Sequence, residues 1–168
     1  MSTREHKAAA PKQVACMVIT VSDTRTEETD KSGQLMKQLL DEAGHMTQLY
    51  QIVKDEPSEV IAAIEAGIAD SQVQVILLNG GTGISPRDNT FEAVSGMLDK
   101  EVPGFGELFR MLSYTEDIGS AAMLSRAVAG TRQGKMIFST PGSTGAVRLA
   151  MTKLIVPELG HVVRELNR

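Results

Sequence analysis

The sequence predicts a single α/β domain of three layers, and three observations lead to this class. First, β-branched apolar runs alternate with amphipathic helical patterns through the first half of the 168-residue chain, as expected of strands joined by crossover helices. Second, the run 73–78 is apolar at nearly every position, which is typical of a parallel strand covered on both faces. Third, glycine- or serine-rich turns follow three of the strands. We therefore expect a mostly parallel sheet with helices on both faces and an antiparallel strand at one edge.

The first half of the chain contains the clearest elements. Strands are predicted at 14–21, 46–53 and 73–78, and the second of these is the weakest. A helix follows the first strand and ends at Gly44, where glycine can stop a helix. The apolar face of this helix consists of Leu35, Met36, Leu39, Leu40 and Ala43. A second helix begins near Pro57, and its apolar face consists of Val60, Ile61, Ile64 and Ile68.

The second half of the chain is less regular. The segment 102–130 is rich in apolar residues without a clear period, and we expect short helices and loops there. Residues 126–140 contain two strand patterns joined by a glycine-containing turn, and the first of them is the expected antiparallel edge. A long helix is predicted over 144–166. It should kink or break at Pro157, because proline cannot donate the backbone hydrogen bond of a helix.

Composition narrows the location and the partners of the chain. Residues 1–12 are expected to form a flexible N-terminus, and residues 13–168 one domain without repeats or linkers. No apolar run approaches the roughly 20 residues of a membrane span, and the N-terminus lacks the apolar core of a secretory signal. We therefore expect a cytoplasmic protein with no membrane partner. Cys16 is the only cysteine and lies in an apolar run, which predicts a buried thiol. A net charge of −4 argues against a nucleic-acid partner.

Three turns are the candidate ligand-binding loops, at 22–24, 79–88 and 140–144. Each follows a strand, and open parallel sheets bind ligands outside the carboxyl ends of their strands. Gly80, Gly81 and Gly83 would let a ligand approach the backbone, whose N–H groups can bind an anion such as phosphate. An ordinary tight turn explains these glycines equally well, because neither a Walker A loop nor a dinucleotide fingerprint is present. The serine and threonine of the third turn could likewise bind an anion or simply cap the last helix.

Acidic residues lie in or next to these turns. Asp88 is not needed as a helix cap, because Asn89 and Glu92 have the spacing of a capping box. A carboxylate beside an anion site is unfavourable unless a cation lies between them, and Mg²⁺ commonly bridges carboxylates and phosphates. Asp55 and Glu56 form a second acidic pair after a strand, although either residue could instead cap the following helix.

The histidines do not indicate a metal or catalytic site. His6, His45 and His161 are scattered along the sequence without metal-ligand spacing. Each is therefore expected to be an ordinary surface residue. Neither a zinc site nor a Ser/His/Asp triad is predicted.

Taken together, the motifs resemble the MoaB/MogA family of molybdenum cofactor biosynthesis. The segments TVSDT, VKDE, GGTG…RD.T.EAV, PGFGELFR, LSRAVAG and PGST occur in the order of that family, from about residue 14 to the C-terminus. The short PGST version and the chain length are most similar to the MoaB branch. The resemblance implies a three-layer α/β fold and a homotrimer or a hexamer made from trimers.

The resemblance also implies an activity and a site. Active members transfer AMP from Mg-ATP to the terminal phosphate of molybdopterin and release pyrophosphate. Molybdopterin and ATP are thus the implied substrates, Mg²⁺ is the implied metal, and other proteins of the pathway are further candidate partners. The two critical aspartates of the family fall on Asp55 and Asp88, the implied catalytic and metal-binding residues. The substrate-binding positions fall on Ser22, Asp23, Gly80, Gly81, Thr82, Gly83, Glu107, Ser125, Pro141, Gly142 and Ser143.

One departure from the family leaves other functions open. Many relatives have a lysine shortly after the glycine of the PG turn, where this chain has Ser-Thr-Gly. Arg148, one helical turn further on, is the candidate replacement for that positive charge. One alternative is a protein of the same pathway that binds molybdopterin without transferring AMP. Another is an unrelated α/β protein that binds nucleotides or phosphate.

Overall fold

The computed structural model describes residues 2–168, in which six strands form one open sheet in the order β2-β1-β3-β6-β5-β4. The strands are β1 (Ala15–Val21), β2 (Met46–Val53), β3 (Val75–Asn79), β4 (Lys100–Glu101), β5 (Val128–Arg132) and β6 (Lys135–Thr140). The first three and β6 run parallel, whereas β5 is antiparallel to both β6 and β4. The mostly parallel sheet with an antiparallel edge is confirmed, although the two-residue strand β4, and not β5, is outermost.

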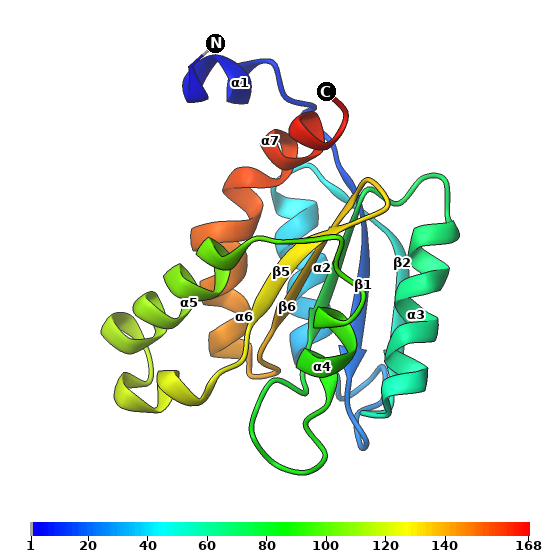
Figure 1. Ribbon diagram of the computed structural model, residues 1–168, viewed down its shortest axis with the longest axis vertical. Helices are drawn as coiled ribbons and strands as arrows, with labels where there is room; N and C mark the ends of the chain where they lie inside the picture. The colour runs from blue at the N-terminus through cyan, green and yellow to red at the C-terminus, as the bar shows by residue number, and fades with distance from the viewer. Residues whose placement is uncertain (1) are drawn as a thin grey trace.

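Helices cover both faces of this sheet (Figure 1). One face carries α2 (Lys31–Glu42), α5 (Pro103–Glu116), α6 (Thr144–Ala150) and α7 (Val156–Leu166). The other face carries α3 (Pro57–Ala69) and α4 (Thr90–Ser95). The short 3-10 helix η1 (Gly119–Leu124) follows α5. The predicted three layers are therefore present. None of the helices within residues 2–168 is long and apolar enough to cross a membrane.

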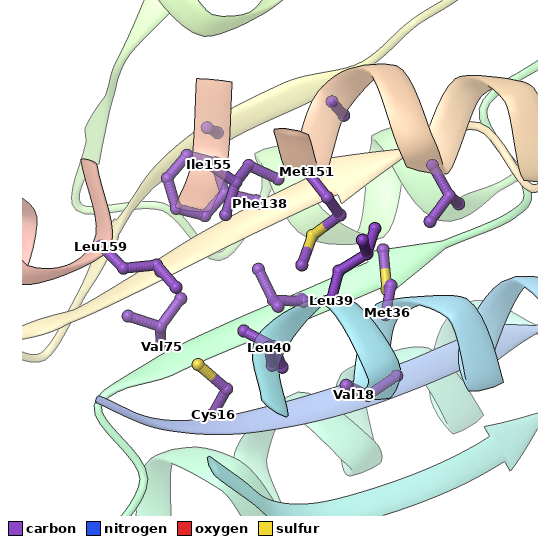
Figure 2. Packing of buried hydrophobic residues seen from close by; sticks show 14 of the residues in the cluster. Cys16, Val18, Met36, Leu39, Leu40, Val75, Phe138, Met151, Ile155 and Leu159 are labelled. Carbon is purple, nitrogen blue, oxygen red and sulfur yellow. The ribbon is translucent and has the colours of Figure 1, made fainter. Parts of the chain in front are cut away.

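Alternate residues of the central strands point into two separate cores. Cys16 and Val18 of β1 pack with α2 on one side, whereas Met17 and Ile19 pack with α3 on the other, as the two-residue period of a strand requires. Figure 2 shows the first core, in which Met151 and the side chains of α2 lie above β1. The buried thiol predicted for Cys16 is confirmed, and burial raises its pKa to about 12.

The early helices follow their predicted patterns with two exceptions. Gly44 ends the helical segment of α2 with a φ of +85°, as expected of a residue that leaves the helix in the left-handed region. Ala43, predicted to face inward, is instead the exposed C-cap of α2. Ile61, also predicted to face inward, lies at the edge of the buried stripe of α3 and is 37% exposed. A periodic pattern alone does not show how wide the covered stripe of a helix is.

The segment 102–130 was expected to form short helices and loops, and it contains the short helix η1, but its first half forms one 14-residue helix, α5. Phe105 and Phe109 of this helix are buried, whereas Leu108 and Met111 are exposed. Because apolar side chains lie on both sides of the helix, the sequence shows no regular alternation of apolar and polar positions that would indicate a helix.

The predicted break near Pro157 is confirmed, and it takes the form of a π-helix. The segment η2 (Met151–Ile155) lies between α6 and α7, directly before the first turn of α7 that holds Pro157. Pro157 has no N–H to donate to the carbonyl of Lys153. A single wider turn before the proline lets the helix continue without that hydrogen bond.

The N-terminal segment contains a helix where the sequence predicts no element. Helix α1 (Thr3–Ala8) begins with a capping box, in which the Ser2 hydroxyl accepts from the N–H of Glu5 and the Glu5 carboxylate accepts from the N–H of Ser2. α1 packs against α7. The flexibility expected of residues 1–12 stays a prediction, and Met1 lies outside the described residues.

Candidate functional site

The loops that follow β1, β3 and β6 meet at the carboxyl ends of these parallel strands. The chain order reverses here, because β2 lies on one side of β1 and β3 on the other. Such a switch point opens the crevice in which α/β sheets bind ligands. A pocket of about 400 Å³ lies at this edge, and α5, η1, the residues between them and Ala146 of α6 contribute further parts of its wall. The fold thus brings together the three turns that the sequence indicated.

Most of the predicted substrate-binding residues line this pocket. They are Ser22, Gly80, Gly81, Thr82, Gly83, Ser125, Pro141, Gly142 and Ser143, and Asp88 lies with them. Phe109, Ile118 and Leu124 supply an apolar part of the wall. The pocket therefore combines backbone and hydroxyl groups from the loops with apolar surface from α5 and η1.

The glycine loop after β3 has a backbone that other residues rarely adopt. Gly80 and Gly81 have φ angles of +104° and +72°. A Cβ atom on Gly80 would lie 2.2 Å from the carbonyl oxygen of Val21, and one on Gly81 would lie 2.0 Å from Thr90 Oγ1. The packing of the turn itself therefore requires both glycines. A tight turn therefore accounts for both glycines. Evidence for a bound ligand comes instead from the groups around the loop.

Arg25 supplies a positive charge to the pocket lining and was not among the residues predicted from the sequence. Its guanidinium donates to the carbonyl oxygen of Gly142 at 2.8 Å and to Asn79 Oδ1 at 3.3 Å. These bonds join the loops after β1, β3 and β6. Arg148, predicted to supply this charge, instead lines a separate pocket with Glu28. The position of Arg25 directly after the SDT turn was the available signal.

Asp88 shapes its loop and also faces the pocket. Its Oδ2 atom accepts hydrogen bonds from the N–H and the hydroxyl of Ser85, at 2.9 and 2.6 Å. Asp88 does not cap α4, whose N-cap is Asn89. The predicted capping box is nevertheless wrong, because the side chain of Asn89 makes no cap bond and Glu92 pairs with Arg126.

Asp55 is buried behind the same loop, where it is only 6% exposed. Its Oδ1 atom accepts from the N–H of Asn89 at 3.1 Å, and it does not cap α3, whose N-cap is Glu56. Burial raises the pKa of the Asp55 carboxyl, the Asn89 N–H opposes this effect, and the charges of Asp88 and Asp23 raise the pKa further. Asp55 therefore belongs to a group of neighbouring carboxylates, although it does not line the pocket.

Asp23 is a predicted substrate-binding residue that holds the loops together from outside the pocket lining. Its two carboxylate oxygens accept from the guanidinium of Arg87 at 2.9 and 3.0 Å, and this pairing lowers the pKa of Asp23. One of these oxygens also accepts from the N–H of Asp55 at 3.1 Å. Arg87 donates to Glu56 as well. Asp23 and Arg87 thus join the turn after β1, the start of α3 and the loop after β3.

Glu107 is a predicted substrate-binding residue that the fold does not bring to the pocket. Helix α5 and its C-cap present Phe109, Ser113 and Asp117 to the pocket, at a spacing of four residues. Glu107 precedes Phe109 by two positions, which is about 200° around a helix. It is exposed on another side of α5.

Arg126, which was also not predicted from the sequence, holds the loop after β3 in place. Its guanidinium donates to the carbonyl oxygens of Gly83 and Asp88 at 2.8 and 2.9 Å. Neighbouring Ser125 lines the pocket, and its buried hydroxyl has no hydrogen-bond partner among residues 2–168. A buried hydroxyl without a partner favours a bound ligand that would complete it.

These features define a class of protein. A pocket at the switch point of an open α/β sheet, with glycine backbone, hydroxyls and an arginine in its wall, is typical of proteins that bind phosphorylated ligands.

Comparison with known proteins gives the family within this class. The family model "Probable molybdopterin binding domain" matches residues 17–161. Molybdenum cofactor biosynthesis protein B of Bacillus cereus is 63% identical over 168 residues, which cover 100% of this chain and 99% of that protein. A crystal structure of molybdenum cofactor biosynthesis protein B has a TM-score of 0.92 at 64% identity, over 95% of this chain and 99% of the other. The tungsten cofactor synthesizing protein MoaB of Pyrococcus furiosus has a TM-score of 0.83 at 38% identity, over 95% and 100% of the two chains.

The chain therefore belongs to the molybdopterin-binding domain family, and the resemblance to MoaB/MogA proteins seen in its motifs is confirmed.

Proposed function

We propose that the protein acts in molybdenum cofactor biosynthesis as a molybdopterin adenylyltransferase. It would join AMP from Mg-ATP to the terminal phosphate of molybdopterin and release pyrophosphate. The observation that carries this proposal is the position of Asp88 in the wall of a pocket that the Gly80–Gly83 backbone also lines. A phosphate held by this backbone would repel the Asp88 carboxylate unless a cation lay between them, as a Mg-nucleotide would supply. Family membership supports the pathway.

The reaction joins two anions, so the task of the site is positioning and charge neutralisation. A phosphate oxygen of molybdopterin attacks the α-phosphorus of ATP and forms a new P–O bond. The bond from that phosphorus to the oxygen bridging the α- and β-phosphates breaks, and its electron pair leaves with pyrophosphate. The N–H of Gly80 already donates to the carbonyl oxygen of Thr140. The donors that would hold the phosphate oxygens are therefore the remaining N–H groups of the glycine loop at positions 81–83, the Ser125 hydroxyl and the Arg25 guanidinium.

The residues present fit a magnesium ion. Asp88 uses Oδ2 and Asp55 uses Oδ1 in hydrogen bonds to the loop, and the second oxygen of each carboxylate has no such bond within residues 2–168. The hydroxyl of Thr90, behind Gly81, is buried and without a hydrogen-bond partner in the same part of the chain. Mg²⁺ in phosphate-transfer sites takes one or two carboxylates, with phosphate and water oxygens completing its shell. When bound, the ion would neutralise charge on the phosphates. We assign the ion to Asp88, in the pocket wall, with Asp55, behind the same loop, as the second carboxylate.

A protein that binds molybdopterin without transferring AMP is the second candidate. The charges in the pocket favour it. The lysine found after the PG turn of many relatives is absent. Arg25 already donates to Gly142 and Asn79, so less positive charge is free to stabilise a transition state between two anions.

A turnover assay with molybdopterin and Mg-ATP distinguishes the candidates. We expect pyrophosphate release that depends on both molybdopterin and Mg²⁺, together with adenylylated molybdopterin as the product. Molybdopterin binding without pyrophosphate release would establish the second candidate. Affinity for common nucleotides without affinity for the pterin would overturn both.

We also propose that the protein forms a homotrimer or a hexamer. Within the GFGELFRML segment, Phe105 and Phe109 are buried in the core of the chain itself. The exposed residues of α5 and η1 nevertheless form an apolar surface that consists of Leu108, Met111, Tyr114, Met123 and Leu124. Surfaces of this kind mark interfaces between protein subunits. The cytoplasmic location stays a prediction.

A further inference from the structure

The junction of α1 and α7 brings together two histidines and a glutamate that are far apart in the sequence. His6 Nδ1 lies 2.6 Å from Glu165 Oε1, and His161 Nε2 lies 3.8 Å from the same oxygen. Each of the three residues offers one possible ligand atom, and these atoms all lie within 4.8 Å of one another. We name these residues the α1–α7 cluster. The spacing of the histidines in the sequence predicted no metal site, and only the packing of α1 on α7 brings His6 to this place.

The cluster has the second layer of contacts that orients metal-binding histidines. His161 and Glu165 lie one turn apart on the same face of α7, a spacing at which two side chains can share one ion. His161 Nδ1 lies 2.9 Å from Glu158 Oε2. A carboxylate can only accept, so a neutral His161 carries its proton on Nδ1 and has its free lone pair on Nε2, the atom that lies 3.8 Å from Glu165 Oε1. A carboxylate partner of this kind fixes the tautomer and the ring orientation of histidine ligands.

The surrounding charges leave Oε1 of Glu165, the oxygen that faces the histidines, available to a metal ion. Arg168 pairs with Oε2 of Glu165 at 2.9 Å, whereas Oε1 is the atom that faces both histidines. Lys7 pairs with Glu158 and holds that carboxylate beside His161. The rings of His6 and His161 are nearly perpendicular, with centroids 6.0 Å apart, so they do not block each other from a shared point.

We propose that the α1–α7 cluster binds one divalent transition metal ion, with Zn²⁺ as the best match. Two imidazole nitrogens and one carboxylate oxygen form a common set of zinc ligands, and a water molecule completes the tetrahedron. Zinc bonds of about 2.0–2.2 Å place the ligand atoms roughly 3.4 Å apart. The observed separations of 2.6 and 3.8 Å lie on either side of that value. Mg²⁺ and Ca²⁺ are excluded as natural occupants because they prefer oxygen ligands.

Binding requires only a small rearrangement at His6. Without metal, His6 Nδ1–H donates to Glu165. The ion takes the place of that proton on Nδ1, and the ring proton of the metal-bound form lies on Nε2, so the imidazole changes tautomer. The bound ion then joins the first helix of the chain to the last.

The site would stabilise the fold and would not serve the reaction. Figure 1 shows α1 and the end of α7 at the end of the molecule opposite the loop that joins β3 to α4. None of the three ligands lines the pocket at the carboxyl ends of the strands. The inference is therefore independent of the proposed enzyme activity.

Zinc titration of the chelator-treated protein by calorimetry tests the inference. We expect saturable binding of one Zn²⁺ per chain, and Co²⁺ in its place should give the intense visible absorption of a tetrahedral site. His6→Ala and His161→Ala should each weaken Zn²⁺ binding about tenfold or more, and Glu158→Gln should weaken it by roughly 10- to 100-fold through the orientation of His161. His45→Asn is the matched control. His45 lies outside the cluster and accepts from the N–H of Val14, a bond that asparagine can keep.

Thermal unfolding gives a second measurement. Zn²⁺ at a hundredfold excess over its dissociation constant should raise the unfolding midpoint of the wild type and of His45→Asn by roughly 5–10 °C. It should not do so for His6→Ala or His161→Ala, whose folding is checked by circular dichroism. The inference is overturned if folded wild-type protein shows no saturable binding below about 100 µM Zn²⁺. It is also overturned if both histidine variants bind Zn²⁺ as tightly as the control.

Discussion

Asp55 holds a negative charge in a place that does not favour one. It is nearly buried, and burial together with the charges of Asp88 and Asp23 raises its pKa. One backbone N–H, that of Asn89, partly offsets this cost. A carboxylate kept under such conditions is typical of a functional site, where stability is given up for chemistry.

We therefore expect Asp55→Asn to stabilise the metal-free protein while reducing AMP transfer. Asparagine can still accept from the Asn89 N–H and carries no charge to bury. The raised pKa means that the cost of the wild-type carboxylate is fully present above its folded-state pKa and disappears as the pH falls through that pKa toward the ordinary value of 3.8. The free energy of unfolding at pH 7 should rise by about 1 kcal/mol, and the difference should shrink in acid. Urea unfolding at pH 7 and at a pH near the ordinary carboxyl pKa of 3.8 measures this difference. A clear loss of stability at pH 7 would contradict the argument.

Asp88→Asn should act on turnover and leave the loop intact. Asparagine can accept the same hydrogen bonds from Ser85, but it is a poorer ligand for Mg²⁺. We expect kcat and kcat/KM for AMP transfer to fall together by about a hundredfold, or roughly 2.7 kcal/mol of transition-state stabilisation, with molybdopterin affinity nearly unchanged. Ser85→Ala is the control, because it disturbs the loop without removing the charge. Wild-type turnover by Asp88→Asn at limiting Mg²⁺ would exclude the proposed role.

At the scale of elements, Asp30 connects α2 to the two strands that precede and follow it. The carboxylate is fully buried and caps α2 by accepting from the N–H of Gly33 at 3.0 Å. It also accepts from the hydroxyls of Thr20 and Tyr50, and the guanidinium of Arg25 lies 3.7 Å away. Burial and the negative Asp30 raise the pKa of Tyr50 above its ordinary value. Asp30 thereby also helps to position Arg25 in the pocket.

Asp30→Ala should destabilise the fold by about 3 kcal/mol, because it removes a helix cap and leaves buried hydroxyls without an acceptor. Tyr50→Phe, which removes one of these bonds, should cost about 1 kcal/mol. The exposed Asp41, on the same helix, offers the matched control, and Asp41→Ala should change the free energy of unfolding by less than about 0.5 kcal/mol. Chemical denaturation measures all three. Equal stability of the Asp30 and Asp41 variants would show that the buried network contributes little.

At the scale of the whole molecule, the apolar surface of α5 and η1 predicts the state of association. Light scattering should give three or six times the chain mass of 18.1 kDa. Tyr114→Glu combined with Met123→Glu, at positions 61% and 78% exposed, should shift the protein toward the monomer by placing charges in a desolvated interface. Ile61→Glu, on α3 across the sheet, should leave the mass unchanged. A wild-type monomer at micromolar concentration would show that this surface has another use.

The sequence by itself determined the class of fold, the family and most of the pocket wall. Strands β1, β2 and β3 and helices α2 and α3 were predicted because local propensity and hydrophobic period agree there. The turns after β1, β3 and β6 could be recognised as one site because the carboxyl ends of parallel strands must share an edge. Helix α5 was missed, because a helix that is apolar on two sides has no clear period.

Only the tertiary structure decided which charges meet. Asp88 lies in the pocket wall and Asp55 lies behind it. Arg25, and not Arg148, lines the pocket, and Glu107 lies outside it. The tertiary structure also brought His6 to His161 and Glu165. Local sequence patterns reflect the backbone and the burial of nearby residues. Contacts between side chains from distant segments depend instead on how whole elements pack, and the pattern of any one segment does not contain that information.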